Sequence, residues 1–188
     1  MDRKQLILHT AIELFATNGY EKTSIATICE HAKVSKGAVF HHFKNKEELL
    51  REVFLHMAEA VSEAEEKLSD INGELPANER LVILLEHIFS GMALPEKQLT
   101  HRFEFQTLCQ PSMRIVLEDL IEKRYQLMMA QFQSVLRDIP SAVGVVDSHM
   151  LIAEIDGIAL NYLFANDDYP LEKIKQRFIK KYLLLLGF

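Results

Sequence analysis

One short segment near the N-terminus limits the possible folds of this chain more than any other feature. Residues 19–50 have the pattern of two short helices joined by a tight turn and followed by the start of a longer helix. The second short helix, expected over residues 35–43, is small and polar, so it can add little to a hydrophobic core. Its size and its hydrogen-bond donors suit the major groove of DNA, where the second helix of a helix-turn-helix contacts base edges.

Cap and stop residues predict where the first helices begin and end. Gly19 is a suitable stop for the first helix, and Thr23 or Ser24 can cap the second. Asn45 and Glu48 have the spacing of a capping box, which predicts the start of a long helix that reaches about residue 69. This helix is expected to complete the core of the three short helices before it, which are marginal alone.

Helical periodicity also dominates the remaining sequence, where no useful strand-like alternation occurs. The fold class expected is therefore all-α, with about nine helices. We predict an N-terminal three-helix helix-turn-helix DNA-binding domain over residues 1–46. A larger helical domain is expected over residues 47–188.

The distribution of charge fits this division. The chain has a net charge of −6, but residues 1–46 contain seven Lys and Arg against four Asp and Glu. The other residues contain 14 against 23. Contact with DNA phosphates needs local positive charge rather than a basic protein as a whole, so the mildly basic N-terminal part is the expected DNA-binding part.

Composition and motifs argue against a membrane protein, a secreted protein and an enzyme. No stretch approaches the roughly 18–20 apolar residues of a membrane helix, and no signal peptide is visible. We therefore expect a cytoplasmic protein without a membrane partner, in which Cys29 and Cys109 are reduced thiols. A redox role for Cys109 is the alternative. No catalytic set of residues or metal-ligand spacing stands out, so no enzyme, cofactor or metal site is predicted. His41 and His42 diverge by about 100° on a helix and cannot share one ion.

Residues 13–50 resemble the TetR family of transcriptional regulators. The resemblance rests on ELF at 13–15, NGY at 18–20, VSKG at 34–37 and HHFKNKEELL at 41–50. Beyond residue 50 it extends only to length, architecture and helix order. In that family the helix that corresponds to residues 35–43 reads the major groove. The family usually has Tyr where this chain has Phe40, so a phosphate contact is lost here or is replaced by His41.

The resemblance implies a set of residues at or near DNA. These are Thr23, Ser24, Ser35, Lys36, Gly37, Phe40, His41, His42 and Lys46. For Thr23 and Ser24 the alternative role is capping, for His42 it is local packing, and for Lys36 and Lys46 it is an ordinary solvated charge.

The resemblance also implies that residues 47–188 are an effector-binding and dimerisation domain, which forms a homodimer and binds a small effector. The last two helices would form a four-helix bundle with those of a partner, through Ile155, Ile158, Tyr162, Ile174, Phe178 and Tyr182. An apolar or amphipathic effector would bind among soft apolar residues and a few polar ones, although core packing is the alternative for each. The candidates are Met57, Phe89, Met92, Phe103, Phe105, Gln106, Cys109, Met113, Tyr125, Met128, Met129, Phe132 and Asn161.

The function expected from these features is ligand-responsive regulation of transcription. The chain would bind a palindromic operator in double-stranded DNA as a dimer, most simply as a repressor, and a small molecule would release it. The alternative is a DNA-binding activator or an interaction module that a protein partner controls.

Overall fold

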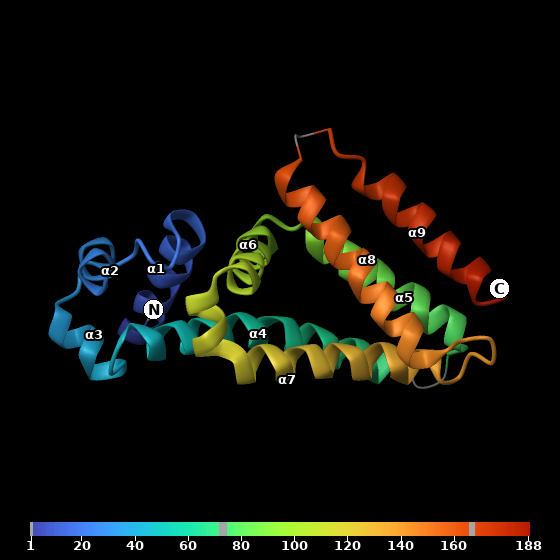
Figure 1. Ribbon diagram of the computed structural model, residues 1–188, viewed down its shortest axis with the longest axis horizontal. Coiled ribbons are helices and arrows are strands. Elements are labelled where there is room, and N and C mark those ends of the chain that lie inside the picture. Colours follow the sequence, from blue (N-terminus) through green and yellow to red (C-terminus); the bar gives the residue numbers. More distant parts are fainter. Residues whose placement is uncertain (1, 72–74, 166–167) are drawn as a thin grey trace. The chain divides into compact units, whose positions relative to one another are not determined.

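The computed structural model describes residues 2–71, 75–165 and 168–188, without the side chains of residues 59–71 and 96. The described residues form helices and connections with no strand, which confirms the predicted all-α fold (Figure 1). The helices are α1 (Arg3–Asn18), α2 (Ile25–Ala32), α3 (Lys36–His42), α4 (Lys46–Ile71), α5 (Ala77–Ala93), α6 (Pro95–Cys109), α7 (Pro111–Leu136), α8 (Gly144–Phe164) and α9 (Leu171–Leu185). None of the helices in these ranges is long and apolar enough to span a bilayer.

The chain forms two compact units, and each is assembled from two separate stretches of sequence. Unit 1 contains residues 1–62 and 99–122, and unit 2 contains residues 63–98 and 123–188. Both α4 and α7 contribute residues to each unit. The boundary predicted at residue 46 marks the end of the helix-turn-helix, whereas unit 1 continues into α4 and also takes in parts of α6 and α7.

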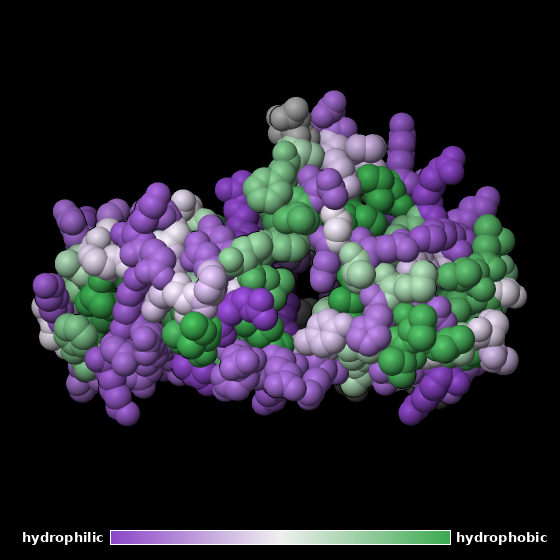
Figure 2. Space-filling model, viewed as in Figure 1, coloured by the Kyte–Doolittle hydropathy of each residue, from purple (hydrophilic) through white to green (hydrophobic). Residues whose placement is uncertain are grey.

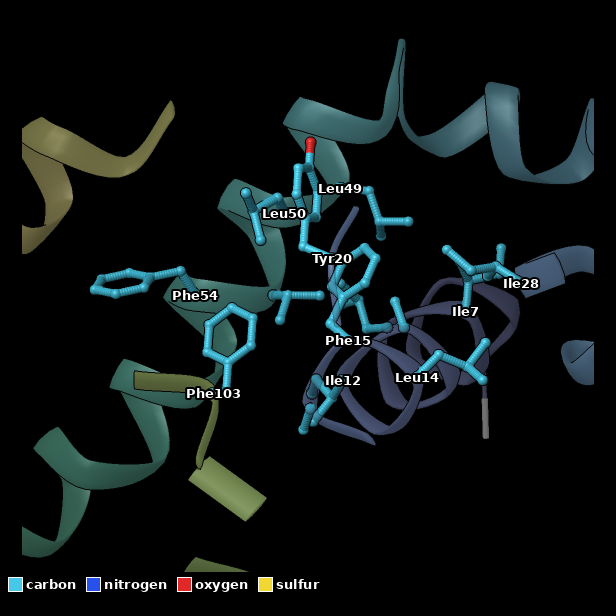
Figure 3. Packing of buried hydrophobic residues seen from close by; sticks show 14 of the residues in the cluster. Ile7, Ile12, Leu14, Phe15, Tyr20, Ile28, Leu49, Leu50, Phe54 and Phe103 are labelled. Atoms are coloured by element: carbon cyan, nitrogen blue, oxygen red, sulfur yellow. The ribbon is translucent and has the colours of Figure 1, made fainter. Parts of the chain in front are cut away.

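The core of unit 1 explains why the three N-terminal helices do not stand alone. Phe15 of α1, Leu50 of α4 and Phe103 of α6 are fully buried in one cluster, and Figure 3 shows their side chains converging from the three helices. Met113 and Leu117 of α7 belong to the same cluster. The fourth helix therefore completes this core as expected, and segments about 50 residues further along the chain complete it as well.

The ends of the first helices follow the local sequence closely. Gly19 has a φ of 85° after the last residue of α1, a conformation that glycine adopts without strain. The Ser24 hydroxyl accepts a hydrogen bond from the Thr27 amide, and Asn45 Oδ1 accepts one of 2.7 Å from the Glu48 amide. The Glu48 carboxylate accepts from the Lys44 amide, one residue before the cap. These contacts satisfy helix N–H groups that have no partner within the helix.

In unit 2, α9 packs against α5 through aromatic side chains. The ring centroids of Phe89 and Phe178 are 5.3 Å apart, and those of Phe178 and Tyr182 are 4.8 Å apart. Tyr182 is fully buried, and burial raises the pKa of its hydroxyl. An ion pair between Lys181 Nζ and the Glu154 carboxylate, at 2.6 Å, links α9 to α8. The inner face of α9 is therefore occupied within the protomer.

Candidate nucleic-acid interface

Helices α2 and α3 form a compact helix-turn-helix. Lys33 ends α2 with a φ of 53°, and the Val34 amide donates to the Cys29 carbonyl at 3.0 Å, so the chain reverses sharply into α3. Val39 and Phe43 are buried and Val34 packs against the same core, as predicted for the inward face. The opposite face of α3 is consequently left for contact with something outside the protomer.

That outer face carries donors and little bulk. Lys36, Gly37 and His41 are exposed, and the Phe40 side chain is 50% exposed. The Ser35 hydroxyl caps α3 by accepting from the Ala38 amide at 3.2 Å, and it keeps its proton for donation to a phosphate. His42 is half-buried and lies edge-on to the His41 ring, with centroids 5.0 Å apart. The outer face of α3 therefore suits a DNA groove, which offers hydrogen-bond acceptors on base edges and phosphates.

The fold itself does not require glycine at position 37. Gly37 has an ordinary helical backbone, and a Cβ atom added there would meet only the Ser35 hydroxyl, at 3.8 Å. Glycine in a helix lowers stability by about 0.5–1 kcal/mol relative to alanine. A residue that is unfavourable for the helix and unneeded for packing indicates that space is kept free on the outside of α3.

The structure corrects the role predicted for Thr23. Its side chain is only 1% exposed, and its hydroxyl donates to the carbonyls of Gly19 at 2.9 Å and Leu14 at 3.2 Å. Both carbonyls lie at the end of α1, where helix carbonyls lack partners within the helix. Thr23 therefore fastens the α1–α2 turn and is withdrawn from the candidate DNA contacts. Ser24 is the N-cap of α2 and remains exposed.

The substitution Thr23→Val is expected to affect stability rather than recognition. It keeps the shape of the side chain but leaves two carbonyls without their donor, which should lower the free energy of unfolding by about 1–2 kcal/mol. Chemical denaturation measures this loss, and Thr23→Ser, which keeps the hydroxyl, is the matched control. Weaker DNA binding by Thr23→Val at unchanged stability would contradict this assignment.

Lys46, at the start of α4, lies over an aromatic ring. Its Nζ is 4.0 Å from the centroid of Tyr20, a cation–π contact. Partial burial lowers the pKa of Lys46, and the nearby Glu21 carboxylate acts in the opposite direction. Burial, together with Glu47 and Glu21, raises the pKa of Tyr20 to about 12. The neutral Tyr20 ring thus orients the Lys46 ammonium at the start of α4. The N-terminus of a helix favours the binding of phosphate.

Replacing Lys46 with alanine should weaken binding to all DNA sequences about equally. Each protomer then loses one phosphate contact, so the slope of log affinity against log salt should fall by about 0.9 for every protomer bound. Fluorescence anisotropy over a range of salt concentrations measures the slope. Lys46→Arg should retain it, and Lys180→Ala on α9 provides a distant charge control. An unchanged slope in Lys46→Ala would remove this residue from the phosphate contacts.

The predicted effector residues are divided between the two units. Met57, Phe103, Phe105, Gln106, Cys109 and Met113 belong to unit 1, whereas Phe89, Met92, Tyr125, Met128, Met129, Phe132 and Asn161 belong to unit 2. In unit 1, Met57, Phe103 and Met113 are buried core residues. In unit 2, Phe89, Met92, Met129 and Phe132 are buried.

Several of the remaining candidates are engaged or exposed. The Gln106 amide donates to the Ala16 carbonyl of α1 at 3.0 Å. Tyr125 is exposed and its hydroxyl lies 2.7 Å from His149 Nδ1. Asn161 is exposed and donates to the Gly157 carbonyl of its own helix, and Cys109 is exposed. Core packing, the alternative given for each candidate, fits the buried members of this set, and the effector site itself stays a prediction.

The predicted dimer residues differ in their exposure within the protomer. Ile155, Phe178 and Tyr182 are buried within the protomer, while Ile158, Tyr162 and Ile174 are half-buried. Four of the five large apolar side chains left exposed on α8 lie on its opposite face. They are Val146, Met150, Leu160 and Phe164, and Phe164 is 80% exposed. Further exposed apolar residues, Val143, Leu184 and Phe188, belong to the end of unit 2 that carries the C-terminus, where Figure 2 shows hydrophobic surface.

A capped, exposed and basic second helix on a tight α2–α3 turn defines a helix-turn-helix DNA-binding protein. Comparison with known proteins specifies the family. Residues 7–53 match the family described as bacterial regulatory proteins, tetR family. The match covers the helix-turn-helix part of the chain and agrees with the resemblance of that part to TetR-family transcriptional regulators.

Individual proteins agree with this assignment. The fatty acid metabolism regulator protein of Bacillus subtilis (strain 168) is 33% identical over 88 residues, which cover 46% of this chain and 44% of the relative. The chain thus spans less than half the length of that relative. A transcriptional regulator from Aquifex aeolicus VF5 is 26% identical, with a TM-score of 0.70 over 98% of this chain and 99% of the other. The regulator FadR from Bacillus subtilis, solved in complex with stearoyl-CoA, shares the fold at 22% identity, with a TM-score of 0.74 and 97% coverage of both chains.

Proposed function

We propose that this chain is a sequence-specific transcriptional regulator that binds a palindromic operator as a homodimer and is released by a small amphipathic effector. The observation that carries the proposal is the outer face of α3, with its capped start, exposed donors and unneeded glycine. Ser35 and Lys36 would contact phosphates, while Gly37 lets the helix approach the base edges.

The exposed face of α8 supports a dimer. Val146, Met150, Leu160 and Phe164 present apolar surface, and Ala153 and Gly157 on the same face are small enough for a second helix to approach closely. Leaving such a stripe in water is unfavourable, and a second copy related by a two-fold axis would cover it. Two recognition helices about one helical turn of DNA apart would then read a palindrome.

Release by an effector would act through helices common to both units. Because α4 and α7 each run through unit 1 and unit 2, a ligand that shifts either helix can alter the support of the helix-turn-helix. The hydrogen bond from Gln106 of α6 to the last turn of α1 is a second connection to that support. To reduce operator occupancy about 100-fold, a ligand must favour the released state by about 2.7 kcal/mol. Repression follows if the operator overlaps a promoter.

Two relatives suggest which ligands to test first. One is named as a regulator of fatty acid metabolism, and another was solved with stearoyl-CoA. An acyl-CoA thioester joins an apolar tail to an anionic head, which agrees with the amphipathic effector expected here. Fatty acids and acyl-CoA thioesters of several lengths are therefore the first compounds for an operator-release assay.

Selection of bound sequences from random duplex DNA tests the proposal. The purified protein is incubated with the library at near-physiological salt, and bound duplexes are sequenced over several rounds. We expect an enriched palindrome whose half-sites lie about one helical turn apart. Binding without enrichment, which fades smoothly as salt rises, would instead support an interaction module without operator reading.

A further inference from the structure

Unit 2 contains a pocket of about 640 Å³ that the DNA-binding function does not use. The end of α5 forms one side of it through Phe89 and Ala93, and Tyr162 of α8 forms another. Tyr169 and the start of α9, including Glu172, Lys173 and Lys175, line the remainder. This volume lies in the range of small-molecule sites, which hold about 300–1,000 Å³.

The inner walls of the pocket are aromatic and are held in place. The rings of Tyr162 and Tyr169 lie 5.7 Å apart at an angle of 51°. Phe89 is buried against Phe178 of α9, so its position is fixed by the packing of α5 on α9. Ala93 leaves the wall open at the last turn of α5. Such surfaces favour a flat or chain-like apolar body.

The two lysines that line the pocket differ in their ion pairs. Lys175 is 13% exposed, and its ammonium pairs with Glu172 at 2.8 Å and Glu86 at 2.9 Å. Lys173 is exposed and has no hydrogen bond or ion pair within the described part of the chain. The two lysines and the two carboxylates therefore sum to zero charge, and Lys173 is the lysine whose ammonium is left unpaired at the pocket.

The N-terminus of α9 also favours negative charge at the pocket. Its N-cap residue, Pro170, provides no side-chain hydrogen bond, and both Pro170 and Leu171 line the pocket. The Leu171 amide donates to the Tyr169 carbonyl at 2.8 Å, and the N–H groups that follow it in this 15-residue helix have no side-chain cap. The dipole of the helix favours an anion at this end.

We propose that this pocket binds an amphipathic anion, with its apolar body against Phe89, Tyr162 and Tyr169 and its carboxylate, sulfonate or phosphate beside Lys173. Binding in the pocket does not depend on the proposed function. Only the identification of its occupant as the effector rests on that function.

A matched pair of fluorescent probes tests the proposal on the full chain. The anionic probe is 1-anilinonaphthalene-8-sulfonate, and its neutral counterpart, N-phenyl-1-naphthylamine, has the same aromatic body without the sulfonate. Ala93→Trp should fill the pocket and abolish the saturable binding of both probes. Lys173→Gln should weaken the anionic probe about fivefold to tenfold and leave the neutral probe unchanged. Lys180→Gln, on the same helix outside the pocket lining, should alter neither.

The outcomes that would overturn the proposal are equally specific. Unchanged affinity of both probes in Ala93→Trp would mean that they bind elsewhere, and equal losses for both probes in Lys173→Gln would exclude recognition of the anion. Circular dichroism verifies that each variant is folded, which is expected because Ala93 and Lys173 are exposed. Operator release by the anionic probe is measured separately, so that a failure of the regulatory role is distinguished from a failure of binding.

Discussion

Gly37→Leu is expected to reduce operator affinity by about 100-fold or more while the protein remains folded and dimeric. The leucine side chain would extend from the outer face of α3 into the space that the base edges need. Within the protomer, a Cβ atom at this position makes only an ordinary contact with Ser35, so no core is disturbed. A loss of this size corresponds to about 2.7 kcal/mol or more of binding free energy.

Two measurements make this prediction decisive. Thermal unfolding should show Gly37→Leu to be at least as stable as the wild type, because leucine has a higher helix propensity than glycine. Fluorescence anisotropy with the selected operator should show the loss of binding. Gly37→Ala is the matched control, since it adds a single methyl group and should retain more affinity. Normal operator binding by Gly37→Leu would contradict the docking of α3 in the groove.

The double substitution Leu160→Asp with Phe164→Asp should convert the dimer to monomers. Both side chains are exposed on α8 in the protomer, so the charges cost little in the isolated chain but would be buried and unpaired in the dimer. Because a monomer contacts only one half-site, operator affinity should fall by about 100-fold or more. Light scattering gives the mass in solution, and anisotropy gives the affinity.

The control for this prediction lies on another exposed apolar residue. Ile115 in the unit 1 part of α7 is 77% exposed, and Ile115→Asp should leave the mass and the operator affinity unchanged. By contrast, Tyr182→Asp would place a carboxylate in the core of unit 2 and unfold it, so it cannot report on the interface. Intact dimers in the Leu160 and Phe164 double variant would rule out the exposed face of α8.

Local sequence was sufficient to predict the features that depend on neighbouring residues. The stop at Gly19, the caps by Ser24 and Ser35 and the Asn45–Glu48 pair each involve atoms within a few residues of one another. The inward Val39 and Phe43 also follow from helical spacing. Thr23 and Ser24 were indistinguishable in the sequence, because only the return of the chain onto α1 buries the first hydroxyl and exposes the second.

Features that depend on long-range packing could not be read in this way. Helix α8 is apolar on two faces, and the pattern does not indicate that the protomer itself covers the face that contains Ile155. Lys33 adopts a left-handed conformation although it is not a glycine, so its residue type does not predict that conformation. The pocket of unit 2 forms where the end of α5 meets Tyr162, Tyr169 and the start of α9, and nothing in the local sequence of these segments predicts that they meet.

The assembly of unit 1 from two stretches of sequence has a consequence for how such regulators diversify. Phe103, Met113 and Leu117 complete the core beneath the recognition helix, although they follow it in the chain by some 60 residues or more. A gene exchange that joins the first 62 residues to a foreign sensor would leave this core open to water. New pairings of DNA-reading and sensing parts must therefore preserve residues 99–122, so the two parts can evolve rapidly by substitution but are difficult to shuffle.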